Sequence, residues 1–134
     1  MLVSTRGRYA LRLLVDLAEN QIGEGYVKLQ EIADRQNVSK KYAERMMAAL
    51  SLQKLVEAHQ GVGGGYRLRV RPEDCRVSDV LSAVHEDAAP VACLSCGQNE
   101  CPRAGTCRTL PMWAKLDGMI HDFFDGVTVA DLMK

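Results

Sequence analysis

Apolar residues near the start of the chain recur every three or four positions. This spacing predicts a helix that begins after a cap at Ser4 or Thr5. Its buried face would be formed by Ala10, Leu13, Leu14, Leu17 and Ala18. Gly23 and Gly25 end the pattern and predict a loop. The chain therefore opens with an amphipathic helix rather than with a continuous apolar stretch.

Two further helices are predicted next, separated by a tight turn at residues 36–38. The apolar face of the first is formed by Leu29, Ile32 and Ala33. The second helix has an N-cap at Ser39 and runs from about Lys40 to Lys54. Its inner face is formed by Tyr42, Ala43, Met46, Met47 and Leu50. This pair is typical of a helix-turn-helix, whose second helix enters the major groove of DNA.

A short hairpin follows the helix pair. Residues 55–59 and 65–70 predict two strands, and residues 60–64 between them contain three glycines. Glycine has no side chain and tolerates a positive φ, so a glycine-rich tip can pass close to a DNA backbone. No strand–loop–helix unit surrounds these glycines, which argues against a nucleotide site. We interpret the hairpin as the wing of a winged helix; the alternative is a plain hairpin that packs on the core.

The second half of the chain predicts three helices and one irregular segment. A helix opens at residues 77–79 and continues through Val84 towards Glu86, whereas residues 87–107 show no periodicity. A long amphipathic helix then begins at Leu110 and ends at Gly126. Its apolar face contains Trp113, Leu116, Ile120, Phe123 and Phe124. The last short helix has a cap at Thr128 and Asp131 in the reciprocal position.

These elements predict a mainly α fold with a small β-wing (α+β). We expect a winged helix-turn-helix over residues 1–72 and a cysteine-loop and dimerisation region over residues 73–134, within one compact domain. On the long helix, the residues expected to face a second copy of the chain are Trp113, Leu116, Ile120 and Phe123. The alternative is that this face packs against the core of its own chain.

Charge is divided unequally along the chain, although the net charge is zero. Residues 1–71 contain 12 Lys and Arg against 7 Asp and Glu, and residues 72–134 contain 5 against 10. A basic half suggests a polyanionic partner, here double-stranded DNA. No apolar run is long enough to cross a bilayer and no signal peptide is apparent, so we expect a cytoplasmic protein without a membrane partner.

The expected DNA contacts come from the recognition helix and from the wing. In the helix they are Ser39, Lys40, Lys41, Tyr42, Glu44 and Arg45. In the wing they are Gln60, Gly61, Gly63 and Gly64. The two lysines also stand beside the N–H groups of the helix N-terminus, which themselves attract phosphate. The alternative is an ordinary solvated helix face.

Four cysteines lie in the irregular segment, with spacing C-x2-C-x4-C-x5-C: Cys93, Cys96, Cys101 and Cys107. Thiolates are soft ligands for iron–sulfur clusters and zinc, and a bound metal supplies order that such a loop lacks. We favour an iron–sulfur cluster, with zinc and a metal-free thiol redox switch as alternatives. Stable disulfides are not expected in a cytosolic protein. Cys75 stands apart and is interpreted as a packed structural residue.

An enzyme is not expected. His59, His85 and His121 are dispersed, and the Cys93–Cys96 pair does not open a thioredoxin-like helix. We therefore predict a sequence-specific transcription regulator, most simply a repressor, whose DNA affinity an iron–sulfur cluster controls. The alternative is a metal-free or zinc-bound regulator that senses through its thiols.

Taken together, the chain resembles the Rrf-two-type (IscR/NsrR/CymR-like) winged helix-turn-helix transcription regulators. The resemblance covers nearly the full chain and rests on residues 4–10, Ile32-Ala33, 63–66, 77–84 and the cysteine loop followed by Trp113. It implies a homodimer built on the long helix, a palindromic DNA site and a cluster near the dimer interface.

The resemblance also implies a ligand set with one open position. Three cysteines of the cluster-binding members match Cys93, Cys101 and Cys107. The fourth ligand is a histidine in one branch, where this chain has Leu110, and an acidic residue of the partner subunit in another, where this chain has Arg8. Cys96 is the obvious substitute, and the cluster type stays open between [2Fe–2S] and [4Fe–4S]. Some relatives also place an arginine where this chain has Gln60 in the wing.

Overall fold

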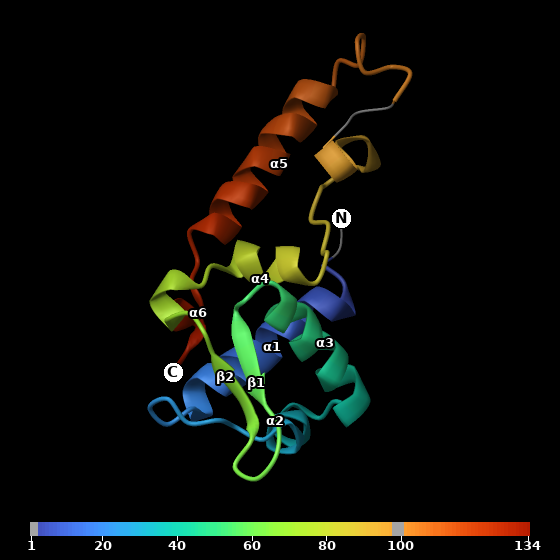
Figure 1. The fold of residues 1–134 in the computed structure, drawn as a ribbon. Coiled ribbons are helices and arrows are strands. Elements are labelled where there is room, and N and C mark those ends of the chain that lie inside the picture. Colours follow the sequence, from blue (N-terminus) through green and yellow to red (C-terminus); the bar gives the residue numbers. More distant parts are fainter. Residues whose placement is uncertain (1–2, 98–100) are drawn as a thin grey trace.

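The computed structural model describes residues 3–97 and 101–134 and shows a compact head from which an arm projects (Figure 1). The head contains α1 (Thr5–Asn20), α2 (Leu29–Gln36), α3 (Lys40–Leu52), β1 (Val56–His59), β2 (Gly65–Leu68), the short 3-10 helix η1 (Pro72–Asp74), α4 (Val77–Ala83) and α6 (Val129–Leu132). The arm contains a second 3-10 helix, η2 (Ala92–Gly97), and α5 (Leu110–Asp125).

Helix α1 is the centre of the head. The Ser4 hydroxyl accepts a hydrogen bond from the Gly7 N–H and caps its first turn. The predicted apolar stripe is buried except for Ala18, which is half-buried, and α1 packs against α2, α3, α4, α6 and β2. Its fully buried apolar side chains are Ala10, Leu13, Leu14 and Leu17. Helical periodicity alone therefore placed the main contribution to the core.

The core extends from α1 to elements at both ends of the sequence. Helix α3 contributes Ala43, Met46, Met47 and Leu50, as its pattern predicted. Val80 and Val84 close the core from the side of α4, and Cys75 is buried there, as predicted. Val129 of α6 is also fully buried in this cluster, so the segment beyond the arm returns to the head.

The sheet consists of β1 and β2, which pair antiparallel from Val56↔Leu68 to His59↔Gly65. One contact was not predicted: Val27, in the loop between α1 and α2, exchanges two backbone hydrogen bonds of 2.8 Å with Tyr66. This bridge ties the wing to the start of the helix-turn-helix.

The arm is attached to the head at both ends. It leaves after α4, and α5 leads back from its tip to α6 (Figure 1). There the Val77 N–H donates to Val127 O and the Val129 N–H to Cys75 O, each over 2.8 Å. Within the described residues, no helix is long and apolar enough to cross a membrane.

Several predicted boundaries were too generous. Helix α3 ends at Leu52 rather than Lys54, where Lys54 has a φ of +61°. Helix α4 ends at Ala83, short of Glu86, because His85 adopts a left-handed φ of +57°. Both strands are shorter than predicted, and the 3-10 turn η2 lies in the segment for which no periodic structure was expected.

Candidate DNA-binding surface and cysteine site

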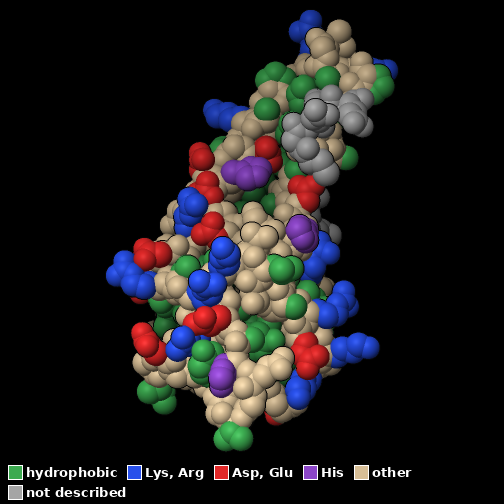
Figure 2. Space-filling view, in the orientation of Figure 1, with side chains coloured by type: hydrophobic (Ala, Val, Ile, Leu, Met, Phe, Trp, Pro, Cys, Tyr) green, Lys and Arg blue, Asp and Glu red, His purple; other side chains and the backbone are tan. Residues whose placement is uncertain are grey.

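The exposed face of α3 carries most of the predicted DNA contacts. Asn37 ends α2 in a left-handed conformation, and the Ser39 hydroxyl accepts from the Tyr42 N–H over 3.1 Å to begin α3. Because the apolar face of α3 is buried, its polar face points outward. The exposed residues are Ser39, Lys40, Lys41, Glu44 and Arg45. In Figure 2, Lys and Arg side chains project along the edge of the head where Figure 1 draws α3, and others lie on the opposite side among acidic ones.

Tyr42 differs from its neighbours because it is half-buried. Its ring meets the Tyr9 ring of α1 edge to face, with 5.8 Å between centroids. The Arg12 guanidinium lies over the other ring of this pair, 4.9 Å from the Tyr9 centroid. Tyr42 therefore holds the first turn of α3 against α1, in line with its predicted place on the inner face of this helix, although its partner Tyr9 was not predicted.

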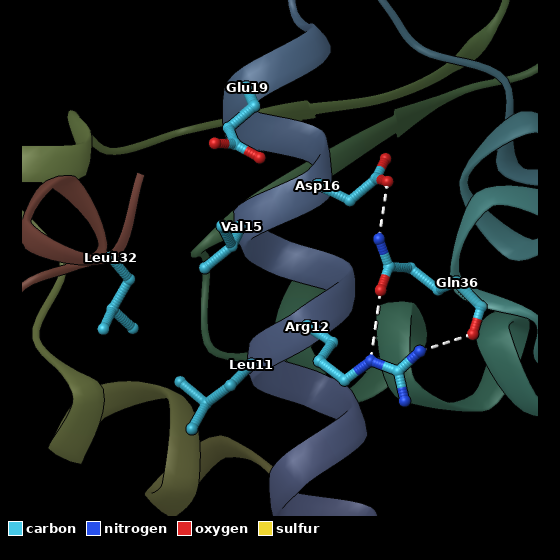
Figure 3. A pocket seen from close by; sticks show the side chains of 7 residues that line it. All are labelled: Leu11, Arg12, Val15, Asp16, Glu19, Gln36 and Leu132. Atoms are coloured by element: carbon cyan, nitrogen blue, oxygen red, sulfur yellow. Dashed lines mark hydrogen bonds between the residues drawn. The ribbon is translucent and has the colours of Figure 1, made fainter. Parts of the chain in front are cut away.

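A polar network joins α1 and α2, and Figure 3 shows the part of it that Arg12, Asp16 and Gln36 form. Asp16 is only 4% exposed, and its carboxylate accepts from the Arg35 guanidinium over 2.7 Å and from Gln36 Nε2 over 2.8 Å. Arg12 donates to the side chain of Gln36 over 3.1 Å and to its backbone carbonyl over 2.6 Å. A buried carboxylate is tolerated only when it is paired in this way. The network sets where the helix-turn-helix turn begins.

An open pocket of about 240 Å³ lies beside this network. Its polar side is formed by Arg12, Asp16, Glu19 and Gln36, and its apolar side by Leu11, Val15 and Leu132. The side chains of Arg12, Asp16 and Gln36 are joined by hydrogen bonds (Figure 3). The pocket therefore does not present these three groups unpaired to a ligand.

Glycines determine the conformation of the wing tip. A Cβ at Gly65, where φ is +149°, would lie 2.1 Å from Val27 O. A Cβ at Gly64 would lie 2.2 Å from His59 O. Gln60, Gly61 and Gly63 are exposed, as expected for residues that approach DNA. Val62 was not among the expected DNA contacts, although its side chain is completely exposed at the tip.

The strands of the wing are braced near the tip by stacked side chains. The rings of Tyr26 and His59 lie 5.2 Å apart, and the Arg67 guanidinium lies 4.6 Å from the centroid of the Tyr26 ring. Arg67 also donates to Glu57 across the strands over 2.5 Å and to Glu24 O over 2.7 Å. These contacts hold the wing in one orientation relative to the loop after α1.

The described cysteines fall into two environments. Cys75 is 1% exposed in the head, and burial raises the pKa of its thiol to about 11. In the arm, Cys93 and Cys107 are half-buried and Cys101 is exposed. The side chain of Cys96 lies outside the described part of the structure.

The chemistry of the arm thiols suits a soft metal centre. Cys107 Sγ lies 3.3 Å from the Thr109 hydroxyl. That hydroxyl, with the N–H groups of Thr109 and Leu110, holds the pKa of the Cys107 thiol below its ordinary value. This favours the thiolate, the form that binds metal. Among the described side chains, which leave out that of Cys96, no group of three metal-binding side chains is assembled around one point. The thiolates are chemically suited to a cluster. Because they are not assembled around one point, cluster binding would have to bring the cysteines of the loop together.

The apolar face of α5 has too little protein to cover it. Trp113, Leu116 and Ile120 are half-buried. Phe123 is 66% exposed, and Met112 and Met119 are exposed to a similar degree. No residue of α5 is buried, although the helix contacts α4 near its base. Of the four predicted dimerisation residues, Phe123 is therefore exposed, beside Met112 and Met119, and the other three are partly covered by their own chain.

Comparisons with known proteins agree with this architecture. A transcriptional regulator named IscR from Aliivibrio salmonicida is 35% identical over 99% of this chain and 77% of its own length. The structure of T. potens IscR matches with a TM-score of 0.77 and 32% identity, covering 98% of this chain and 85% of that one. The structure of CymR, the global cysteine regulator of B. subtilis, matches with a TM-score of 0.79 and 28% identity, covering 98% and 95%.

These relatives are transcription regulators and not enzymes, as predicted. The solved structures also confirm the predicted winged-helix fold. The family model described as an iron-dependent transcriptional regulator matches residues 3–134. The chain therefore belongs to the Rrf2 family of DNA-binding transcription regulators.

Proposed function

We propose that this regulator binds a palindromic DNA site as a homodimer, and that an iron–sulfur cluster in its arm controls its affinity for that site. The observation that supports this most strongly is the separation of two functions. The head contains the buried hydrophobic core. Four of the five cysteines lie instead in the arm, whose helix α5 has no buried residue. The matching family model is described as an iron-dependent transcriptional regulator, which supports control by an iron centre.

Cys93, Cys101 and Cys107 would hold the cluster, with Cys96 as the fourth ligand. Cys96 and Cys93 share the 3-10 turn η2, and Cys107 lies shortly before α5, which begins at Leu110. When bound, the cluster supplies a centre that responds to redox state and to small iron-binding molecules. Residues 87–107 join α4 to α5, so any reorganisation of this segment acts on both elements.

The two copies would meet along α5. Pairing buries the apolar face of each α5 and relates the two heads by a two-fold axis, so each α3 enters one half-site of a palindrome. Lys40 and Lys41 contact phosphate, and Glu44, Arg45 and Gln60 are exposed where they can contact base edges or the backbone. A protein that regulates bacterial genes in this way acts in the cytoplasm.

Anaerobic purification and reconstitution test the cluster. The wild-type protein should show visible charge-transfer absorbance and contain both iron and acid-labile sulfide. Cys93→Ser, Cys101→Ser and Cys107→Ser should each lose the cluster, because a serine oxygen is a harder and less readily ionised ligand than a thiolate. Cys75→Ala is the matched control: it removes a thiol from the head and should leave the iron and sulfide content unchanged.

Cys96→Ser decides the fourth ligand. Loss or conversion of the cluster would assign that ligand to Cys96, and an unchanged spectrum would place it elsewhere, including the partner subunit. Tight zinc binding without acid-labile sulfide in the wild-type protein would contradict the iron–sulfur proposal.

A second candidate is a metal-free thiol switch. The similarity to CymR supports it, as does the lowered pKa of the Cys107 thiol. It predicts that the anaerobic protein is colourless, and that mild oxidation changes DNA affinity through a disulfide or another thiol adduct in the arm that peptide mass spectrometry can locate. A reconstituted cluster that alters DNA affinity would favour the first proposal instead.

A further inference from the structure

The chain changes direction sharply where it leaves the head for the arm. After α4, the His85 N–H donates to Ser82 O over 3.0 Å and the Glu86 N–H to Leu81 O over 2.9 Å. His85 takes the left-handed position, with a φ of +57°, that glycine usually occupies in this kind of helix ending. A residue with a Cβ is disfavoured there. The turn is therefore maintained despite its conformational cost, and it directs Glu86 back towards α1.

The Glu86 carboxylate binds the N-terminus of α1. One oxygen accepts from the Ser4 N–H over 2.8 Å, and the other accepts from the Ser4 hydroxyl. Arg6 adds a second link, because its guanidinium donates to His85 O over 3.1 Å. Burial raises the pKa of Glu86, but the hydrogen bonds from Ser4 and the charge of Arg6 outweigh this and hold it below its ordinary value. The carboxylate is therefore charged and acts as an acceptor at neutral pH.

Gly7 makes this contact possible. A Cβ at Gly7 would lie 2.9 Å from the Glu86 carboxylate and 3.1 Å from two of its side-chain carbons. The Glu86 side chain therefore lies directly against the first turn of α1. We call the contacts among Ser4, Arg6, Gly7, His85 and Glu86 the Ser4–Glu86 clasp.

The clasp stands between the arm and the DNA-binding surface. On one side, Asp87 follows Glu86 directly and begins the irregular segment, where its carboxylate accepts from the Ala89 N–H over 2.9 Å. On the other side, the same end of α1 carries Tyr9, whose ring packs on Tyr42 of the recognition helix. Arg12, one turn further, donates to the carbonyl that ends α2.

From this arrangement we infer that Glu86 is a positioning residue that couples the conformation of the cysteine arm to the orientation of the recognition helix through the first turn of α1. This inference rests on the proposed regulation by the arm and names the contact that transmits it. A shift of the first arm residues moves Glu86, Glu86 moves Ser4 and the first turn of α1, and Tyr9 carries the displacement to Tyr42. Coupling of two sites requires such an element with two arrangements.

The test compares DNA affinity with and without the cluster. The probe is a duplex selected in vitro from a random pool by the wild-type protein, and the quantity measured is the ratio of the two dissociation constants. In Glu86→Gln this ratio should move towards one by about 5-fold or more, the lower end of ordinary coupling between sites. Iron and sulfide content should stay at the wild-type level, because Glu86 is outside the cysteine set.

Gly7→Ala is an independent variant that adds one methyl group and leaves the chemical identity of Ser4, Arg6, His85 and Glu86 unchanged. Replacing glycine by alanine in a helix ordinarily stabilises a protein, but here the new methyl group displaces the flexible end of Glu86. It should therefore reduce the ratio as Glu86→Gln does, without loss of folding. Glu73→Gln, which neutralises an exposed carboxylate of the head outside the clasp, is the control and should retain the wild-type ratio.

Hydrogen exchange gives a readout that does not depend on a variant. Loading the wild-type protein with its cluster should change the protection of amides in residues 4–9, which are far from the cysteines in sequence. Wild-type ratios in folded Glu86→Gln and Gly7→Ala, or unchanged protection of this segment, would overturn the inference and leave the proposed regulation standing. A ratio of one in the wild-type protein itself would instead overturn the proposed regulation, and the inference with it.

Discussion

Helices α1 and α5 are both 16 residues long, yet their environments are opposite. Six residues of α1 are buried, and none of α5 is. Both helices are amphipathic, so hydrophobic periodicity does not distinguish them. The difference lies in what surrounds each: α1 is enclosed by five other elements of its own chain, whereas the main contact of α5 among the described elements is with α4. An apolar helix face of this kind requires a second surface, and for α5 we propose that the surface is another copy of the chain.

The largest effect should follow from a cavity in α1. Leu14→Ala should lower the free energy of unfolding by about 2–5 kcal/mol, because it removes a fully buried side chain from the densest part of the core. Chemical denaturation of the metal-free protein measures this. Phe123→Ala is the matched change in α5 and should act only through subunit association, so its effect should depend on protein concentration. A concentration-dependent effect of Leu14→Ala would contradict the contrast.

The cysteines should show the same contrast in reactivity. Burial raises the pKa of Cys75 to about 11, so its thiolate population at neutral pH is about 100-fold below that of an ordinary thiol. In the metal-free protein, iodoacetamide should therefore label the arm cysteines well before Cys75, as a time course of peptide mass spectrometry would show. Early labelling of Cys75 would mean that the head opens more readily than its packing indicates.

A charge on α5 should separate the subunits. Phe123→Glu should weaken association by about 2 kcal/mol, or roughly 30-fold, because a buried carboxylate without a partner is costly at an interface. Sedimentation or light scattering across a dilution series measures this. Ala114→Glu is the control: helical periodicity places this exposed residue away from the apolar face, so it should leave association unchanged. A wild-type protein that is a monomer at micromolar concentration would refute the dimer.

The smallest effect concerns the surface of the head. Reversing the charges of Lys40 and Lys41 together should weaken binding to all DNA sequences and reduce the dependence of log affinity on log salt by roughly 2 units per head. Lys115→Glu, on the arm, is the control and should leave this slope unchanged. An unaltered slope in the double variant would show that α3 does not face the phosphates.

Local signals in the sequence were reliable, and long-range contacts were invisible. Ser39, Thr128 and Asp131 act as the caps that their spacing predicted, because capping involves only neighbouring residues. The Asp16–Arg35 pair and the Val27–Tyr66 bridge join residues from different elements, and no periodicity relates them. The same holds for the site. The exposure of Lys40 and Lys41 follows from the helix pattern, whereas the packing of Tyr42 depends on Tyr9 in another helix.

The return of α6 to the head has a consequence for synthesis. Val129 is fully buried in the head, but the ribosome makes it only after the whole arm. The hydrogen bonds between Val77 and Val127 and between Cys75 and Val129 close a long loop, and closing such a loop costs conformational entropy. During synthesis, the core of the head therefore lacks Val129 on one side until after the cysteines have been made. A chain that stops within α5 would have a head whose core lacks the contacts of Val129 and is exposed to solvent on this side.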